Sequence, residues 1–336
     1  MEGTVVLTGA NGSLALGFVQ ALLETHPQKT LVATVRNPSP EKDPNTEKLL
    51  ALAARFPKAK FHLETLDLGK LANVRSFADK LSRLISSGAL PRISAVVCNA
   101  ASLSFEGGQK FTADGYESTF QVCHLAHYLL ILKLLGSMNL TSGRIVMLGS
   151  ITHYPEKSNP LCSLRPQFPA DMEELLRPGP DPPALVHDRG FQRYATAKLA
   201  NVTLANDLNR RLKRDDRLSS ITAIAMDPGG LPSARSQAQQ KRSTQRIFAV
   251  INFLMPVLKH ATTMFRTTED AGRDLVALSV DSSFQGKRGY YMGQKEDIPA
   301  AVSINPDVQT KLWDTCWGWC GLAAEDTVLR DAAPEK

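Results

Sequence analysis

The chain lacks a long hydrophobic run. Its most apolar stretch, IFAVINFLMPVL at 247–258, has 12 residues and includes Asn252 and Pro256, whereas a helix that spans a bilayer needs about 20 apolar residues. The N-terminal residues lead directly into an apolar strand pattern, without the basic flank of a secretory signal. These absences argue against a transmembrane or secreted protein and indicate a hydrophobic lid or an interfacial helix at 247–258.

Cysteine is scarce and has no regular spacing. The chain has five cysteines, an odd number, and none of them forms a CxxC pair. They are Cys98, Cys123, Cys162, Cys316 and Cys320. This usage fits a reduced intracellular compartment, and we expect a cytoplasmic protein.

The chain also lacks a strong excess of one charge. It has 39 Lys and Arg against 33 Asp and Glu, for a net charge of +6. Its one basic cluster, RRLKRDDR at 210–217, contains acidic residues and is typical of a solvated helix end rather than a nucleic-acid patch. With 43% hydrophobic and 21% charged residues, the composition excludes disorder, collagen and coiled coil. We therefore expect no nucleic-acid partner.

Short β-branched runs alternate with longer helical patterns along the chain. The runs lie at 4–8, 30–35, 60–66, 94–99, 143–150 and 220–226. The helical patterns lie at roughly 14–25, 45–55, 70–86, 112–138 and 190–214. This alternation predicts βαβ units and a single α/β domain with a doubly wound parallel sheet.

Proline concentrates between two of these elements. The stretch 155–183 holds eight of the 20 prolines, and proline lacks the N–H that helices and sheets need, so we expect a loop insertion there. We divide the chain into a catalytic domain over 1–300 and a helical C-terminal extension over 301–336. The catalytic domain includes the insertion and a substrate-lid region at 234–265.

The turn after the first strand has the composition of a nucleotide-binding loop. Residues 8–17 read TGANGSLALG, and a helix pattern follows at once. Gly9 and Gly12 permit a tight turn and close approach to a pyrophosphate, which the N–H groups of the helix N-terminus would bind. An incidental glycine turn is the alternative, but the position at the first strand-to-helix junction favours the binding loop.

Three later strand ends carry residues that suit a dinucleotide. Arg36 follows the second strand, where it can pair with a 2′-phosphate, so NADP(H) is favoured over NAD(H). An ordinary surface arginine is the alternative. Asp67 follows the third strand and can meet an adenine amino group or cap a helix. Asn99 and Ala100 end the fourth strand, and the small residue leaves room for a cofactor.

A tyrosine and a lysine share one helical face. Tyr194 and Lys198 are four residues apart in a helical pattern. A nearby cation, aided by an oxidised nicotinamide, lowers a tyrosine pKa from its usual value of about 10, so the phenol can exchange a proton near neutral pH. Ser150, at the end of the fifth strand, can donate a hydrogen bond to the same carbonyl oxygen.

In this order, the motifs TGANGSLA, Asp67, CNAA, GS, YATAK and DPGG over residues 4–295 resemble the short-chain dehydrogenase/reductase family, which has a Rossmann-like fold. The resemblance implies that Tyr194 is the catalytic acid/base, that Lys198 binds the nicotinamide ribose and lowers the tyrosine pKa, and that Ser150 orients the carbonyl. It implies an NADP(H) site formed by Thr8, Gly9, Asn11, Gly12, Ser13, Leu14, Arg36, Asp67, Leu68, Asn99, Ala100, Tyr194, Lys198, Pro228, Gly229 and Ser233.

The chain departs from the family pattern in three places. Ser13 and Ala15 stand where the family usually has glycine, which leaves the loop geometry open. Cys123 stands where the family usually has an asparagine that shapes a helix kink and helps to hold a proton-relay water. The third departure is the separation of 44 residues between Ser150 and Tyr194. Such long gaps occur in the branch that resembles retinol dehydrogenases, protochlorophyllide reductases and 3-ketosteroid reductases.

Two further clusters have other interpretations. His124 and His127 could ligate a metal, but no third ligand is evident, so we expect structural roles and no metal. Cys316 and Cys320 lie one helical turn apart near three tryptophans, in a packed helix or in a surface that docks on a partner or membrane.

The resulting prediction is an NADP(H)-dependent oxidoreductase, a ketoreductase of secondary metabolism, acting on a small hydrophobic substrate such as a steroid, polyketide or terpenoid ketone. Two alternatives stay open. One is a non-catalytic NADP(H)-binding regulatory protein. The other is a membrane-surface or scaffold protein that uses 247–258 and the tryptophan-rich tail. Self-association also stays open, because family members often form dimers or tetramers.

Overall fold

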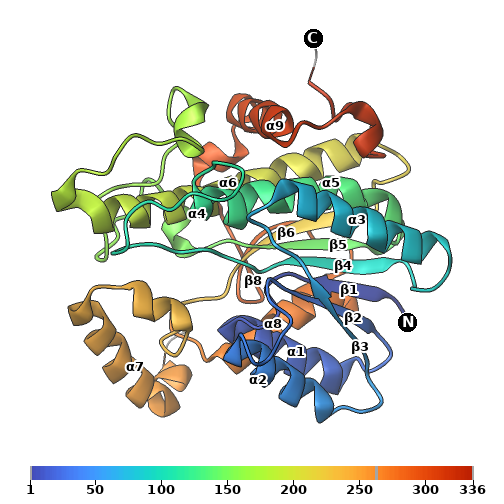
Figure 1. Ribbon diagram of the computed structural model, residues 1–336, viewed down its shortest axis with the longest axis horizontal. Helices are drawn as coiled ribbons and strands as arrows, with labels where there is room; N and C mark the ends of the chain where they lie inside the picture. The colour runs from blue at the N-terminus through green and yellow to red at the C-terminus, as the bar shows by residue number, and fades with distance from the viewer. Residues whose placement is uncertain (1, 262–263, 335–336) are drawn as a thin grey trace.

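An eight-stranded sheet forms the centre of the computed structural model, which describes residues 2–261 and 264–334 (Figure 1). The strands are β1 (Thr4–Leu7), β2 (Thr30–Val35), β3 (Lys60–Thr65), β4 (Ile93–Cys98), β5 (Arg144–Leu148), β6 (Thr222–Asp227), β7 (Gly289–Met292) and β8 (Lys295–Asp297). Their order is β3-β2-β1-β4-β5-β6-β7-β8, and every pairing is parallel except that of β7 with β8. The order reverses between β1 and β4, where open α/β sheets bind ligands.

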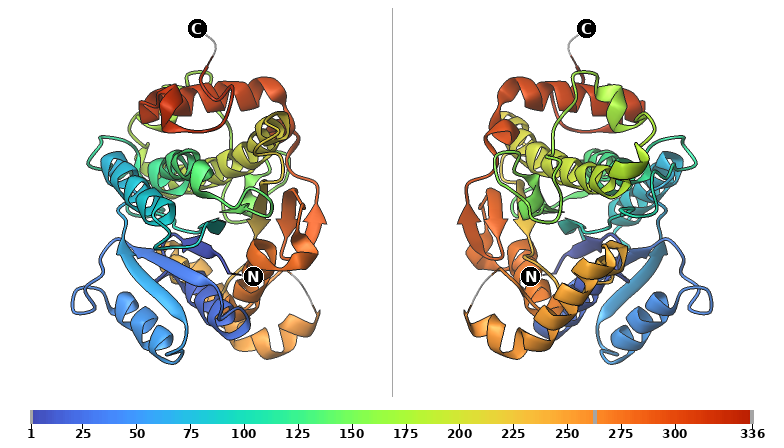
Figure 2. Two further views of the ribbon diagram at one scale, coloured as in Figure 1. Left: turned by 90° about the vertical axis from the view of Figure 1, so that its right-hand side faces the viewer. Right: turned by 90° about the vertical axis from the view of Figure 1, so that its left-hand side faces the viewer.

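Helices cover both faces of this sheet (Figure 2). One core cluster includes side chains of α3 (Leu71–Ser86), α5 (Ala126–Leu134), α6 (Val186–Arg214) and α9 (Pro306–Cys320). The cluster on the other face includes α1 (Ser13–Thr25), α2 (Pro44–Ala54) and α8 (Thr268–Val280). The central strands are apolar at successive positions because both of their faces are buried. The predicted doubly wound α/β domain is therefore confirmed.

Helices α1 and α8 cross with their backbones in contact. A Cβ atom on Gly17 would lie 2.2 Å from the Thr268 carbonyl oxygen, and one on Gly272 would lie 2.3 Å from the Gly17 carbonyl carbon. Only glycine fits at both positions without moving a helix. This crossing holds the start of α8 beside α1. The long segment that follows β6 therefore also ends beside α1.

The helix predicted over 112–138 begins later and changes its winding. Helix α4 covers Ser118–Phe120, a π-turn covers Gln121–Leu125, and a 3₁₀ turn at Leu135–Ser137 follows α5. Among the described residues, this run is the one helix that is long and apolar enough to cross a membrane, but 83% of its apolar window is buried within the protein. It is therefore a core helix, as its central place in Figure 2 shows.

The C-terminal extension packs onto the core. Trp313 and Trp317 of α9 are buried, and the Trp313 indole N–H donates to the Ala332 carbonyl at 2.7 Å. Trp313 also contacts the Tyr128 ring, with ring centroids 5.2 Å apart. The alternative that these tryptophans form an exposed docking surface is therefore wrong, because their side chains already fill the space over α5 and α6.

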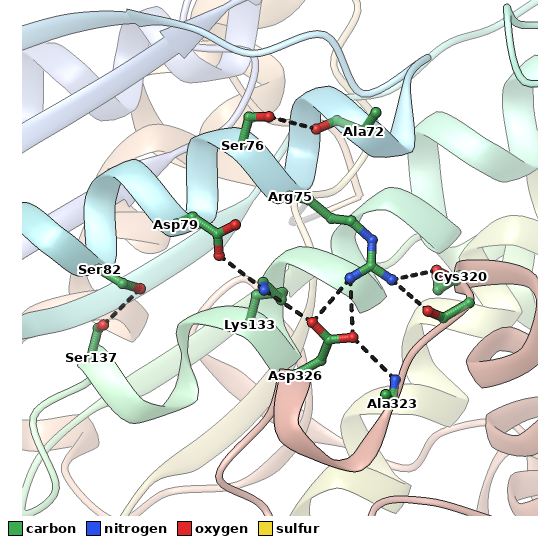
Figure 3. Close-up of polar contacts among 11 residues, drawn as sticks. Ala72, Arg75, Ser76, Asp79, Ser82, Lys133, Ser137, Cys320, Ala323 and Asp326 are labelled. Atoms are coloured by element: carbon green, nitrogen blue, oxygen red, sulfur yellow. Dashed lines mark hydrogen bonds and ion pairs between the residues drawn. The ribbon is translucent and has the colours of Figure 1, made fainter.

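A charged cluster ties the last turns of the chain to α3 and α5 (Figure 3). Both Asp326 carboxylate oxygens accept from Arg75 Nη1, at 3.0 and 3.1 Å. Lys133 Nζ lies 3.0 Å from Asp326 and 2.9 Å from Asp79. Arg75 Nη2 also donates to the Cys320 carbonyl at 2.7 Å. The C-terminal segment is thus held by polar contacts as well as by buried tryptophans.

The proline-rich insertion is mostly loop, as predicted. Within 155–183 the regular element is a 3₁₀ turn at Met172–Leu175. Helix α7 (Arg242–Ala261) occupies the predicted lid region and stands at the periphery, away from the sheet (Figure 1).

Candidate active site

A cleft with a volume of about 860 Å³ opens at the carboxyl ends of the central strands. Twelve of the residues predicted for the site line it. They are Gly9, Gly12, Ser13, Leu14, Arg36, Asp67, Leu68, Asn99, Ala100, Tyr194, Lys198 and Pro228. The predicted residues outside this lining are Thr8, Asn11, Ser150, Gly229 and Ser233.

The glycine loop leaves the N-terminus of α1 open toward the cleft. Gly9 has φ +63°, and a Cβ atom there would lie 2.9 Å from Ala100 Cα, so this position requires glycine. Gly12 is the N-cap of α1 and provides no side-chain cap. The first-turn N–H groups of the helix, with its positive dipole end, therefore suit a phosphate group. Ser13 and Ala15, in place of the family's glycines, are compatible with this turn.

Thr8 braces the loop from beneath. Its hydroxyl oxygen accepts from the backbone N–H groups of Asn99 and Ala100, each at 3.0 Å, and lies 2.9 Å from His127 Nε2. The Thr8 hydroxyl therefore donates to Nε2, and His127 Nδ1 donates to the Cys123 carbonyl at 3.1 Å. Burial lowers the pKa of His127 to about 4, so this link is neutral.

Asn11 also supports the loop instead of lining the cleft. Its side-chain amide donates to Asp43 at 2.9 Å and to Thr46 at 3.1 Å, which ties the loop to the start of α2. Arg36, exposed after β2, lines the cleft itself. The Arg36 guanidinium and the N-terminus of α1, which has no side-chain cap, thus line the same cleft.

Asp67 lines the cleft and does not cap a helix. Its carboxylate accepts from the Gly69 N–H at 3.0 Å, and the N-cap of α3 is Lys70. The alternative helix-capping role for Asp67 is therefore wrong, and its other oxygen lies 4.0 Å from Lys70 Nζ. Asn99 donates its side-chain amide to the carbonyls of Thr8 and Gly9, at 2.9 and 3.2 Å.

Tyr194 and Lys198 lie together on α6, as their spacing predicts. Lys198 Nζ is 5.5 Å from the centroid of the Tyr194 ring and donates to the Leu148 carbonyl at 2.9 Å. Burial raises the pKa of Tyr194 above its usual value, and the Ser150 side chain opposes this shift by hydrogen bonding to the phenol. Burial also lowers the pKa of Lys198, and the neighbouring Cys123 and Asp227 oppose that shift.

Ser150 is held from two sides. Its Oγ accepts from the Thr152 N–H at 3.3 Å, and its carbonyl lies 2.7 Å from His153 Nδ1. His153 Nε2 accepts from the Ala300 N–H at 3.1 Å, so Nδ1 is the protonated nitrogen and donates to Ser150. The segment after β8 therefore fixes the backbone of Ser150 beside Tyr194.

Cys123 occupies the π-turn that kinks the helix after β4. Its thiol lies 3.5 Å from the Ser102 carbonyl, and its own carbonyl lies 3.1 Å from His127 Nδ1. The kink expected from an asparagine is thus present without one. His127, four residues further along, supplies the strong hydrogen bond to this turn.

The segment after β6 differs in part from the prediction. Pro228 lines the cleft, and Gly229, with φ +79°, donates its N–H to Asp227 at 2.9 Å. Ser233 is exposed and lies outside the lining, so its contact with the cofactor stays a prediction. Arg235 lines the cleft instead, and its N–H donates to Ser13 Oγ at 3.1 Å. The sequence offered no motif for Arg235, because loop geometry sets its place.

The two buried histidines of the π-turn region each contact other groups of the protein. His124 Nδ1 lies 3.0 Å from Asn201 Oδ1, and its Nε2 lies 3.6 Å from Cys316 Sγ. In the part of the chain that the structure describes, no three His, Cys, Asp or Glu side chains gather as a metal site. These contacts fit the structural roles expected for His124 and His127.

Residues 235–329 match the family described as AcuH dehydrogenase domain. The short-chain dehydrogenase iccH of Talaromyces variabilis is 29% identical and aligns over 98% of both chains. Protochlorophyllide reductase B, chloroplastic, of Oryza sativa subsp. japonica is 27% identical over 97% of this chain and 79% of its own. The solved landomycin C-6 ketoreductase LanV with bound NADP and rabelomycin has a TM-score of 0.56 and 13% identity, covering 87% of this chain and 96% of that one.

The structural likeness supports the fold, and the sequence likeness extends over the whole chain. The long separation between Ser150 and Tyr194 is typical of the branch that resembles protochlorophyllide reductases. Such a reductase is among the similar proteins. With the glycine loop and the Tyr194–Lys198 pair meeting in one cleft, the chain is similar over nearly its whole length to proteins named short-chain dehydrogenase and protochlorophyllide reductase.

Proposed function

We propose that the protein is an NADPH-dependent reductase of ketones or aldehydes in hydrophobic molecules. One observation carries the proposal: a single cleft is lined both by the uncapped first turn of α1 and by Tyr194 beside Lys198. The helix end suits the phosphates of a dinucleotide. The tyrosine and lysine suit proton transfer to a carbonyl oxygen.

Arg36 supports NADP(H) over NAD(H). An arginine after the second strand can pair with a 2′-phosphate, whereas the NAD-type site has an acidic residue that accepts from the 2′-hydroxyl. Asp43 also lines the cleft, but its carboxylate already accepts from Asn11 and Asn45. The similar ketoreductase LanV was solved with bound NADP, which agrees with this choice.

Different lining residues would bind different parts of the cofactor. The cofactor supplies the hydride when it is bound. The N–H groups of Ser13 and Leu14 would hold the pyrophosphate, and Asp67 with Leu68 would lie beside the adenine. Lys198 would bind the nicotinamide ribose, because its ammonium lies next to Tyr194 and has donors to spare beyond the Leu148 carbonyl. Asn99, Ala100 and Pro228 would form the walls between these parts.

Tyr194 supplies the proton in this proposal. Burial keeps the phenol protonated at neutral pH, so it can donate to the carbonyl oxygen as hydride arrives at the carbonyl carbon. Ser150 orients the same oxygen, and its own position is fixed through His153. A protonated donor favours the reductive direction.

The remaining lining favours an apolar substrate. Leu103, Phe111, Val122 and Leu231 contribute apolar side chains to the cleft. Beside it, the ring of Phe105 lies edge-on to Tyr194, with centroids 6.0 Å apart. These surfaces suit a steroid, polyketide or terpenoid ketone, and rabelomycin bound to LanV points to the polyketide class.

The test is NADPH oxidation with a panel of hydrophobic ketones, comparing the wild type with Tyr194→Phe. Loss of the proton donor should lower kcat by about 10²- to 10⁴-fold while NADPH binding stays unchanged. Tyr116→Phe, outside the cleft lining, is the matched control and should keep full activity. NADPH binding without turnover of any ketone, and without a difference between the variants, would instead support a non-catalytic NADP(H)-binding protein.

We also propose a cytoplasmic location. The five cysteines are free and buried, which fits a reducing compartment. Fractionation of cells that express the full chain would test it.

A further inference from the structure

Helix α7 exposes apolar side chains that the cleft does not use. Phe253 is 82% exposed and Val257 is 71% exposed. Ile247, Val250 and Leu254 are also exposed. Ordinary surfaces scatter such side chains singly, so a group of five on one helix indicates an interaction surface. We call these five residues the α7 stripe.

The α7 stripe faces away from the body of the protein. Ile247, Val250, Leu254 and Val257 recur at intervals of three and four residues, so they share one side of the helix. The other side of α7 contacts the body: Met255 is buried, and the Phe248 and Phe265 rings have centroids 6.4 Å apart. Both views in Figure 2 place α7 at the edge of the molecule, so the stripe meets solvent.

The segment that carries the stripe is basic, and two of its cations, Lys241 and Arg266, pair with Asp188 and Asp274 of other segments. Residues 228–268 contain six Lys and Arg and no Asp or Glu. Arg242 and Arg246 are exposed, and Arg246 precedes Val250 by four residues, on the same side of the helix. Helices that lie in a membrane interface combine an apolar face with basic residues that reach the headgroups, and α7 has both kinds of residue exposed.

We propose that the α7 stripe docks the protein on an anionic lipid surface. Arg242 and Arg246 would meet lipid headgroups while Phe253 and Val257 enter the acyl boundary. A second copy of this chain fits less well, because two such faces would bring like charges together. A lid closing over the cleft also fits less well, because the stripe is on the side of α7 opposite Met255 and Phe248. This proposal does not depend on the substrate or on catalysis.

The experiment is co-sedimentation of the full chain with phosphatidylcholine vesicles, with and without phosphatidylserine. We expect binding to the phosphatidylserine vesicles that added salt weakens. Phe253→Ser with Val257→Ser should weaken this binding by at least about tenfold, and so should Arg242→Glu with Arg246→Glu. Each pair changes exposed side chains, so unchanged thermal unfolding checks that the variants are folded.

Matched controls use exposed residues elsewhere. Ile298→Ser removes an apolar side chain that is 79% exposed, and Lys58→Glu with Arg83→Glu reverses two charges away from α7. Both controls should bind vesicles like the wild type.

Two results would overturn the proposal: no binding to phosphatidylserine vesicles, or equal binding by all variants. Analytical ultracentrifugation and ketone turnover distinguish the two alternatives, a second copy of this chain and a lid over the cleft. If Phe253→Ser with Val257→Ser converts a dimer to a monomer without changing vesicle binding, a second copy covers the stripe. If it lowers only ketone turnover, the stripe is part of a lid.

Discussion

Tyr194 is partly buried at the wall of the cleft and has a neighbouring cation, Lys198. Burial raises the pKa of its phenol from 10.0, and the Ser150 hydroxyl opposes this without reversing it. A group with a raised pKa keeps its proton through neutral pH and loses it only at alkaline pH. The acid needed for carbonyl reduction is therefore present at physiological pH without any titration.

This gives a pH prediction for the reductive reaction. With NADPH bound and no positive charge on the nicotinamide, kcat should stay level from pH 6 to pH 10, because the raised pKa of Tyr194 lies above this range. The measurement is kcat for a turned-over ketone from pH 6 to pH 10. A fall centred near pH 7 would contradict a protonated Tyr194 and indicate that a different group supplies the proton.

Among single residues, the sequence predicted those for which the site requires a particular backbone angle or a particular position on a helix. Gly9 needs a positive φ, and Tyr194 and Lys198 need one helical face, so composition and spacing predicted their positions. Ser233 and Arg235 lie in a loop that contacts Ser13 through the Arg235 N–H, and no local pattern separates which of the two faces the cleft. The sequence also did not predict the hydrogen bond from His127 to the Cys123 carbonyl, because Cys123 lies in a π-turn that local patterns do not reveal.

The C-terminal segment is attached to α3 and α5 through one carboxylate, that of Asp326. Partial burial acts to raise the pKa of Asp326, but hydrogen bonds from the Ala323 N–H, Lys133 and Arg75 outweigh it and hold the pKa below 3.8. A carboxylate with a lowered folded pKa contributes stability above its unfolded pKa, and this contribution is lost as pH falls through the folded value.

Asp326→Asn should therefore destabilise the protein at neutral pH by about 1–3 kcal/mol. The difference from the wild type should disappear in strong acid, where both side chains are uncharged. Thermal or urea unfolding at several pH values measures it. Asp79→Asn is the control and should cost less, because Asp79 pairs with Lys133 at 2.9 Å and its side chain is 48% exposed. An equal loss for both variants would mean that the cluster in Figure 3 does not hold the C-terminal segment through Asp326.

The elements that the sequence predicted are the long, strongly patterned ones. Six strands and the main helices up to α6 lie where periodicity placed them. Strands β7 and β8 have four and three residues, and their pairing with the sheet edge is a tertiary contact that a short apolar run does not reveal. The helix expected from 112 begins at Ser118, because Thr112–Glu117 forms a turn that pairs with Phe111 and Leu176.

Among the histidines that the structure describes, His124, His127 and His153 are buried and have lowered pKa values. Burial lowers the pKa values of His124, His127 and His153 to about 4 from 6.5. Between these values the unfolded chain binds more protons than the folded one, so the free energy of unfolding falls as pH drops from about 6.5 to about 4. Below the folded pKa values the histidines contribute no further change.

We expect this loss to be visible at pH 5 to 6. The slope of the unfolding free energy against pH should stay below the uptake of about three protons, because burial raises the pKa values of Glu117 and Asp227 and the folded state binds their protons first. Urea unfolding at closely spaced pH values measures the slope. A His62→Gln variant should keep it, because His62 is exposed. A free energy that stays level from pH 6.5 to pH 5 would contradict the neutral, buried state of these histidines.

The central claim is that one cleft binds NADPH through the loop after β1 and through Arg36. The most direct test is a titration of the purified protein with NADPH and with NADH, following nicotinamide fluorescence, for the wild type, Arg36→Ala and the control Arg83→Ala. We predict that NADPH binds about ten- to a hundredfold more tightly than NADH, that Arg36→Ala removes this preference, and that Arg83→Ala keeps it. A folded wild type that binds neither cofactor, or that binds both equally with and without Arg36, would contradict the account.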